Sequence, residues 1–188
     1  MKFPNAYPFL EKSSIFFEDF ALVPIRYQDR VNIMKWRNEQ IYHLRQSEPL
    51  TKKNQDKYFK SVVAKLFIQE KPDQVLFSFL KDDICIGYGG LVHINWIDKH
   101  AEISFIMDTS LEKIDFHKNW SIFLSLIEEV AFKGLFLHKI FVYAFDLRPH
   151  LYETLKKSNY FLDARLIEHC YFDGSFKDVV IYSKLSGQ

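Results

Sequence analysis

The stretch that decides the fold runs from Ile84 to Trp120 and reads ICIGYGGLVHINWIDKHAEISFIMD followed by TSLEKIDFHKNW. Two apolar runs rich in β-forming residues flank the polar turn 98–100, which predicts antiparallel strands at 84–96 and 99–107. A polar loop then leads into an amphipathic helix that starts near Lys118. Unpaired N–H groups and the dipole at a helix start favour negative charge, so this junction is a candidate phosphate site.

The flanking regions predict further strands and helices in a mixed order. Alternating patterns predict strands at 21–25, 75–80, 139–145, 161–172 and 176–185, with turns at 81–83 and 173–175. Helical spacing, N-caps at Asp29 and Thr51, Pro149 in a first turn and Gly134 as a C-cap predict helices near 30–38, 52–71, 118–133 and 149–158. We therefore expect one α/β (α+β) domain over residues 1–188, with a mixed, mostly antiparallel sheet flanked by helices.

Composition excludes several classes of protein. Hydrophobic residues make up 48% of the 188 residues, which excludes a mostly disordered chain. The formal net charge of +1 gives no electrostatic reason to expect nucleic acid or an anionic membrane as partner. No apolar run approaches the roughly 20 residues that span a bilayer. The first residues lack the apolar core of a signal peptide, which favours a cytoplasmic location.

Cysteine and histidine give no sign of a metal centre. Cys85 and Cys170 are isolated in predicted strands, so we expect free thiols rather than a disulfide framework. The seven histidines show no metal-ligand spacing, and neither a phosphate-binding P-loop nor a G-x-S-x-G motif occurs. The sequence predicts no metal cofactor.

Five short motifs, in this order, resemble the GNAT superfamily of acyl-CoA-dependent N-acetyltransferases. They are Trp36-Arg37-Asn38 after a short helix, the segment 49–51, the run 86–91, the run 101–105 and the hairpin 173–182. Each motif is weak alone, and their order and spacing are similar to the branch that acetylates ribosomal proteins and nucleotide-linked amino sugars. The resemblance implies acetyl-CoA as co-substrate and a primary amine, in an amino sugar nucleotide or at a protein N-terminus, as acceptor.

The resemblance also implies where acetyl-CoA lies. In the family the fourth and fifth strands splay apart at a bulge, and acyl-CoA lies in the resulting V. Its pantetheine would pair with the backbone of Phe105, Ile106 and Met107, and its pyrophosphate would sit on the following loop and helix start. The cofactor residues implied on that loop are Lys113, Phe116, His117, Lys118 and Asn119.

The loop departs from the family pattern. The pyrophosphate motif falls on residues 115–120, where Lys118 and Trp120 occupy the two positions that are normally small. Glycine at such positions lets backbone approach phosphate closely. The lysines and His117 could attract a pyrophosphate by charge, whereas Asp115 would oppose it. Two alternatives therefore stay open: a non-catalytic binding module of the same fold, or an acyltransferase for a longer acyl donor.

Two residues are implied as catalytic. Glu102, in the strand that reads AEISF, would be the general base, since the family often uses a glutamate there. A carboxylate with that function needs burial or neighbouring groups to make it more basic, and an exposed strand glutamate is the alternative. Tyr152 would be the general acid for the leaving thiolate, although the family position itself aligns with Leu155 and Tyr152 lies about one helical turn earlier.

Six residues are candidates for binding the acceptor. They are Trp36, Arg37, Asn38, Tyr88, His93 and Tyr171. The alternative for Trp36 is a tryptophan packed at a capped helix end. The alternative for His93 is a structural histidine whose hydrogen bonds are satisfied. The sequence is compatible with a homodimer and does not specify the oligomeric state.

Overall fold

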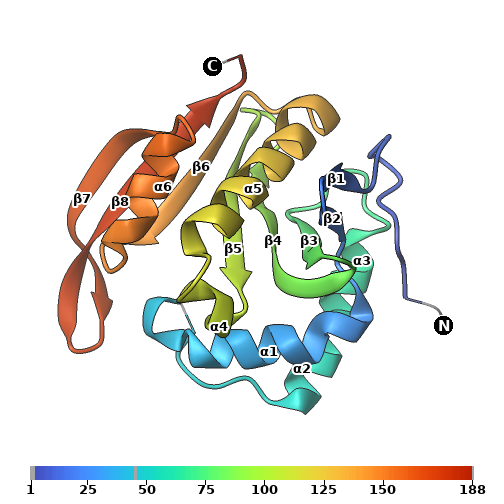
Figure 1. Cartoon of the computed structure of the whole chain (residues 1–188), viewed down its shortest axis with the longest axis horizontal. Coiled ribbons are helices and arrows are strands. Elements are labelled where there is room, and N and C mark those ends of the chain that lie inside the picture. Colours follow the sequence, from blue (N-terminus) through green and yellow to red (C-terminus); the bar gives the residue numbers. More distant parts are fainter. Residues whose placement is uncertain (1–2, 45, 188) are drawn as a thin grey trace.

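The computed structural model describes residues 3–44 and 46–187 and contains one eight-stranded sheet (Figure 1). Its strand order is β1-β2-β3-β4-β5-β6-β8-β7. Every neighbouring pair is antiparallel except β5 and β6, which are parallel. The strands are β1 (Ile15–Phe17), β2 (Phe20–Pro24), β3 (Val75–Lys81), β4 (Ile84–Asn95), β5 (His100–Met107), β6 (Lys139–Phe145), β7 (Phe161–Phe172) and β8 (Ser175–Leu185).

The part of the chain that the structure describes contains six α-helices beside the sheet, and two of them continue as π-helix. They are α1 (Arg30–Glu39), α2 (Lys52–Tyr58), α3 (Ala64–Leu66), α4 (Thr109–Glu112), α5 (Phe116–Glu128) and α6 (Pro149–Lys157). A π-helical segment, Phe59–Val63, joins α2 to α3, and another, Glu129–Gly134, extends α5. The predicted mixed sheet flanked by helices is confirmed.

The parallel pair of strands separates soon after it starts. β5 and β6 pair only over three positions, His100 with Lys139, Ala101 with Ile140 and Glu102 with Phe141. Beyond them β6 stays paired with β8, while β5 stays paired with β4. The two strands thus form a V that opens toward their carboxyl ends, where α4 and α6 begin (Figure 1). The bulge lies in β4 between Val92 and Asn95, rather than in either arm of the V.

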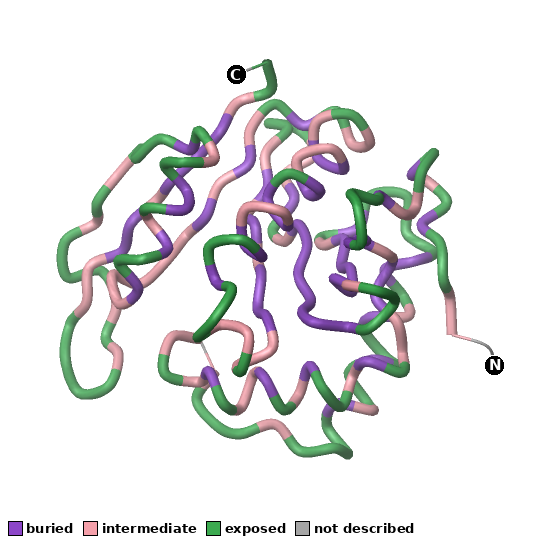
Figure 2. The backbone as a smooth tube through the Cα atoms, in the orientation of Figure 1, coloured by how far each residue is buried: buried purple, intermediate pink, exposed green. Residues whose placement is uncertain are grey.

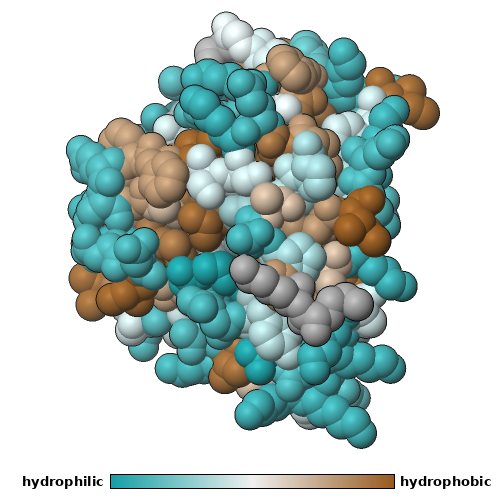
Figure 3. Space-filling model, turned by 90° about the vertical axis from the view of Figure 1, so that its right-hand side faces the viewer, coloured by the Kyte–Doolittle hydropathy of each residue, from teal (hydrophilic) through white to brown (hydrophobic). Residues whose placement is uncertain are grey.

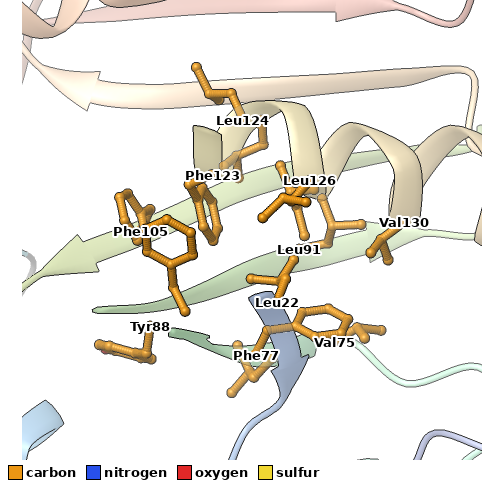
Figure 4. Packing of buried hydrophobic residues seen from close by; sticks show 14 of the residues in the cluster. Leu22, Val75, Phe77, Tyr88, Leu91, Phe105, Phe123, Leu124, Leu126 and Val130 are labelled. Carbon is orange, nitrogen blue, oxygen red and sulfur yellow. The ribbon is translucent and has the colours of Figure 1, made fainter. Parts of the chain in front are cut away.

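The two faces of the sheet receive different helices. Phe105 on β5 stacks on Phe123 of α5 with 3.9 Å between ring centroids, which places α5 on that face (Figure 4). Tyr88 lies on the opposite face, where its hydroxyl accepts a hydrogen bond from Arg37 of α1. Gly89 permits the tight packing at this level, since a Cβ there would lie 2.2 Å from the Ser104 carbonyl oxygen. The most buried backbone accordingly follows β3, β4 and β5 (Figure 2).

Four details of the predicted helices are corrected or confirmed. Thr51 caps α2 as predicted, because its hydroxyl accepts from the Asn54 amide. Asp29 precedes α1 but makes no side-chain cap; its carboxylate binds Arg26 instead. Gly134 is still helical, and Phe136 takes the left-handed conformation with φ of 53°. The long helix begins at Phe116, two residues before the predicted start, because the short helix α4 takes up part of the expected loop.

The N-terminal segment packs more firmly than its sequence indicates. Tyr7 is 1% exposed, and its hydroxyl donates to the Leu76 carbonyl and accepts from the Leu76 amide. On the face that carries this segment and β1, hydrophobic side chains gather in several separate patches (Figure 3). None of the helices in residues 3–44 and 46–187 combines the length and apolarity needed to cross a membrane.

Candidate active site between β5 and β6

A cavity of about 310 Å³ fills the V between β5 and β6. One wall is β5 from Glu102 to Ile106, and the other is β6 from Val142 to Phe145. β6 turns away from β5 after Glu102, so the facing backbone edges here are not paired with each other. Such an edge can hydrogen-bond an extended ligand as a strand would. The remaining lining residues are Arg37, His43, Leu44, Val92, His93, Trp120, Arg148 and Leu151.

A second cavity of about 410 Å³ adjoins the first on the α1–α2 side of the sheet. Arg37, Val92 and Ser104 line both cavities, so the two spaces share a wall. The lining residues of the second cavity alone are Ile33, Leu50, Asn54, Gln55, Tyr58, Phe59, Gln74, Leu76 and Tyr88. Two adjoining spaces, one between strands and one under helices, suit a reaction between two bound molecules.

Glu102 lies where the V begins to open. Its side chain is 16% exposed and lines the first cavity, and its Oε2 lies 3.9 Å from Nε2 of His93. His93 is in the β4 bulge with φ of 51°, and its side chain is 70% exposed. Ser104 follows Glu102 on the same face of β5 and reaches the second cavity. A carboxylate at this position can take a proton from a group that sits at the shared wall.

An ion pair closes the open end of the V. Nη2 of Arg148, just before α6, donates to Oε1 of Glu112 in α4 at 2.6 Å, and both side chains are about 10% exposed or less. The Arg148 guanidinium also lies over the Phe116 ring at 5.1 Å. Its Nε is buried without a hydrogen-bond partner in the described residues. Burial lowers the pKa of Arg148 while Glu112 opposes that change. A buried cation with an unused donor is a candidate anion site.

A chain of hydrogen bonds fixes this end of the cavity. The Gln40 side chain donates to the carbonyl of Met107, the last residue of β5, and its Oε1 lies 3.3 Å from Nε2 of His43. Nδ1 of His43 lies 3.5 Å from Nη1 of Arg148. Burial and then the charge of Arg148 lower the pKa of His43 to about 3. His43 is therefore neutral, with its proton on Nε2 for Gln40 and Nδ1 free to accept from Arg148.

The residues expected to hold acetyl-CoA fall into two groups. Phe105 and Ile106 line the first cavity, whereas Met107 is 1% exposed and lies outside its lining. None of the loop residues Lys113, Phe116, His117, Lys118 and Asn119 lines it. The ammonium of Lys118 lies 5.6 Å from the Phe20 ring, toward β2, and the imidazole of His117 bonds the Thr154 hydroxyl of α6 at 2.6 Å. Phe116 reaches the site through Arg148, and Trp120 packs against Phe105.

The residues expected to hold the acceptor divide in the same way. Arg37 and Tyr88 line the second cavity and are joined by a 2.7 Å hydrogen bond. Trp36 is 2% exposed and belongs to the core. Asn38 fixes the following loop, since its amide and carbonyl groups bond the backbone of Leu50. Tyr171 is 68% exposed near the tip of the β7–β8 hairpin and lines neither cavity.

Tyr152 does not line the V either. Its hydroxyl donates to the Asp146 carboxylate at 2.8 Å, and its ring stacks on Tyr182 of β8. Burial, and then the bond to Asp146, raises the pKa of Tyr152, so the phenol keeps its proton. Tyr143 lies in the β6 wall of the cavity, and its hydroxyl lies 3.7 Å from the Cys170 sulfur of β7.

Arg148 and His43 were also missed by sequence reasoning. Arg148 follows a predicted strand and directly precedes Pro149, a position at a strand end where ligands often bind. That signal could have drawn attention to it. His43 lies in an irregular segment, and its partner Arg148 is 105 residues away, so no local pattern could have found it.

Comparison with known proteins decides the family. Residues 22–148 match the family described as acetyltransferase (GNAT) domain. The chain belongs to the GNAT family. As a GNAT protein it is an N-acetyltransferase whose co-substrate is acetyl-CoA, and the match contains both arms of the V. A search of curated protein sequences finds no match.

Solved structures share the GNAT fold at low sequence identity. A spermidine N-acetyltransferase from Vibrio cholerae in complex with CoA and spermine is 18% identical, with a TM-score of 0.76 over 90% of this chain and 96% of that chain. Mutant forms of the spermidine/spermine N-acetyltransferase from Vibrio cholerae are 19% identical, with a TM-score of 0.73 over 90% of this chain and 95% of that chain. A dodecameric structure of the spermidine N-acetyltransferase from Vibrio cholerae is also 19% identical, with a TM-score of 0.73 over 90% of this chain and 95% of that chain.

These neighbours do not single out the branch that the short motifs resemble. Their likeness establishes the fold.

Cys85 is buried and Cys170 is half-buried, and both are free thiols. Within residues 3–44 and 46–187, no cluster of histidine, cysteine and acidic side chains has the arrangement of a metal site.

Proposed function

We propose that the whole chain, residues 1–188, acts as one acetyltransferase domain that moves an acetyl group from acetyl-CoA to a primary amine. The observation that carries this is the pair of adjoining cavities with Glu102 at the point where β5 and β6 separate. The V suits the thioester arm of acetyl-CoA, and the second cavity suits the acceptor. Their shared wall brings the two reacting groups together.

Glu102 is the proposed general base. Acetyl-CoA supplies an activated acetyl group as a thioester. The Glu102 carboxylate takes a proton from the acceptor ammonium, directly or through a water molecule, which frees the nitrogen lone pair. The nitrogen then forms a bond to the acetyl carbon as the carbon–sulfur bond breaks, in a ternary complex without a covalent enzyme intermediate. His93, 3.9 Å from Glu102, can pass the proton to solvent.

The leaving thiolate needs a proton donor. Tyr152 was the candidate from the family resemblance, but its hydroxyl bonds Asp146 and lies outside the cavity lining. Tyr143 lines the β6 wall, but its hydroxyl lies 3.7 Å from the Cys170 sulfur of β7, on the far side of β8 from the V. We therefore propose that the thiolate leaves as the carbon–sulfur bond breaks and then takes its proton from a water molecule.

Arg148 is the proposed anchor for the pyrophosphate of acetyl-CoA. Its guanidinium lines the V, has a buried unpartnered Nε, and already binds one anion, the Glu112 carboxylate. The phosphate charge would replace that of Glu112. This would compensate for the missing small residues at Lys118 and Trp120, because a side-chain cation can bind phosphate without close backbone approach.

The acceptor is a primary amine whose finer identity rests on resemblance. The short motifs point to an amino sugar nucleotide or a protein N-terminus, whereas the neighbours from Vibrio cholerae act on spermidine. Each class would enter the second cavity from the α1–α2 side. The charge of that cavity distinguishes them.

The proposed chemistry is tested by Glu102→Gln, with acceptor-dependent release of free CoA thiol as the measurement. We expect kcat to fall by about 10²- to 10⁴-fold while the Kd for acetyl-CoA is unchanged, since the carboxylate serves proton transfer only. Glu70→Gln, an exposed change that lines neither cavity, is the control. An unchanged kcat and pH–rate profile in Glu102→Gln would exclude this base. Activity with a longer acyl-CoA but none with acetyl-CoA would show that acetyl-CoA is not the donor.

We also propose that two copies associate through the β7–β8 hairpin. β7 is an edge strand, and Ile167, Tyr171 and Phe176 on this hairpin are each more than 60% exposed. Exposed apolar edges promote association, and a neighbour of this fold is described as dodecameric. Light scattering should give the mass of an oligomer for the wild type and of a monomer for Ile167→Lys/Tyr171→Lys. A monomeric wild type at micromolar concentration would contradict the proposal.

A further inference from the structure

Among the described residues that line the second cavity, one carries a formal charge. Apart from Arg37, the described residues that line this cavity are uncharged: Ile33, Leu50, Asn54, Gln55, Tyr58, Phe59, Gln74, Leu76, Tyr88, Val92 and Ser104. Their polar groups are amides, phenols and a hydroxyl, which bind either sign of charge weakly. The described lining of this cavity therefore carries a net positive charge.

Arg37 differs from the other arginines in the described residues. Each of the others pairs with a carboxylate: Arg26 with Asp29, Arg30 with Asp56, Arg148 with Glu112, and Arg165 with Asp146 and Asp178. Arg37 donates instead to neutral oxygens, from Nη1 to the Tyr88 hydroxyl at 2.7 Å and from Nε to Oε1 of Gln46 at 3.0 Å. Within residues 3–44 and 46–187, no acidic side chain forms an ion pair with it.

The two hydrogen bonds hold the Arg37 guanidinium in place. Gln46 is itself held by Asn38, to which its side-chain amide donates at 3.0 Å. Tyr88 extends from the central strand β4 on the side of the sheet away from Phe105 (Figure 4). A half-buried cation that is fixed by neutral partners and lacks a carboxylate is prepared to bind an external anion.

We propose that the acceptor of this enzyme is an amine that also carries an acidic group, a carboxylate or a phosphate, and that Arg37 binds this group. The inference rests on the proposed function and deepens it. Arg37 and Ser104 line both cavities, and Ser104 lies two residues from Glu102 on one face of β5, a separation of about 7 Å. An acceptor whose acidic group sits at Arg37 can thus direct its amine toward Glu102.

A polyamine fits this cavity poorly. Each of its ammonium groups would meet the Arg37 charge without a carboxylate in the second-cavity lining to offset it. An acidic amine instead neutralises Arg37 and leaves only its ammonium for the Glu102 carboxylate. Acceptor choice then separates this enzyme from the spermidine acetyltransferases of the same fold, despite their similar backbone.

The test measures binding by calorimetry, which does not require acetyl transfer. The probes are two matched pairs and one polycation: glucosamine 6-phosphate against glucosamine, alanyl-alanine against alanyl-alaninamide, and spermidine. We expect the acidic member of at least one pair to bind roughly ten- to hundredfold more tightly than its neutral partner, as a charge-assisted hydrogen bond provides. The pair that shows the difference distinguishes phosphate from carboxylate.

Arg37→Gln should remove that difference and should change the Kd for acetyl-CoA far less, because Arg37 meets the V only at the wall that the two cavities share. Lys35→Gln is the matched control, because Lys35 is a cation of the same helix that lines neither cavity. Equal binding of both members in both pairs, or tighter binding of spermidine, would overturn the inference. Neither outcome would contradict the proposed acetyl transfer. That proposal would be disproved if the wild type did not bind acetyl-CoA, or if Glu102→Gln kept the wild-type kcat.

Discussion

His43 makes one end of the active site sensitive to acid. Burial and the adjacent Arg148 lower its pKa to about 3 in the folded chain, from a usual value near 6.5. Between these two values the unfolded chain binds a proton that the folded chain does not. The free energy of unfolding should therefore fall as the pH falls from about 6.5 toward 3, by up to about 1.4 kcal/mol per pH unit.

Urea unfolding at pH 7, 6 and 5 measures this dependence. His43→Gln should flatten it, because glutamine offers an acceptor to Arg148 without a titrating group. His138→Gln, at an exposed position, should keep the wild-type slope. If the free energy of unfolding of His43→Gln fell with pH as steeply as that of the wild type, a group other than His43 would cause the acid sensitivity.

Single residues also mark the limit of sequence reasoning. Glu102, Arg37 and Tyr88 could be named in advance because each lies in a short motif, and each lines at least one of the two cavities. Arg148 and Glu112 could not be paired in advance, since 36 residues separate them and no periodicity relates them. The buried Tyr7 was missed for the same reason, because its partner Leu76 lies 69 residues along the chain.

At the scale of elements, the short helix α4 controls access to Arg148. Glu112 of α4 competes with the pyrophosphate for this guanidinium under the proposed function. Glu112→Gln should lower the stability of the free protein by about 3 kcal/mol, because it leaves a buried cation unpaired. It should also strengthen acetyl-CoA binding severalfold, because the phosphate then meets no competitor. Arg148→Gln should weaken that binding roughly ten- to hundredfold.

The control for α4 breaks a different buried pair. Lys184 of β8 bonds Glu128 near the end of α5 at 2.8 Å, with side chains that are 11% and 19% exposed. Glu128→Gln should lower stability without changing the Kd for acetyl-CoA, as measured by calorimetry. If Glu112→Gln weakened acetyl-CoA binding instead, Glu112 would be part of the cofactor site rather than a competitor.

The elements were predicted well where local periodicity decides them. The strands of the β3–β4–β5 meander and the β7–β8 hairpin follow from alternation and turn residues. The start of α5 was misplaced because α4 takes up residues that read as loop. The V has no local signal in the β5 residues, since it arises from β6 following β8 rather than β5.

At the scale of the whole molecule, the proposed function gives the sheet two ligands, one in the V and one in the second cavity. β4 and β5 carry Tyr88, Ser104 and Glu102, and β6 supplies the other wall of the V beyond the point of divergence. Arg37 of α1 and Arg148, just before α6, would then supply one cation for each ligand. The central claim is therefore that the V between β5 and β6 holds acetyl-CoA.

Calorimetric titration of acetyl-CoA into a variant with the V filled tests that claim most directly. Ala144 lies in the β6 wall, so Ala144→Phe should obstruct the cavity, whereas Ala164→Phe places the same side chain on β7 outside it. We expect binding to the wild type and to Ala164→Phe, with binding to Ala144→Phe weakened at least a hundredfold and its circular dichroism unchanged. Undiminished binding to a folded Ala144→Phe would show that acetyl-CoA lies elsewhere.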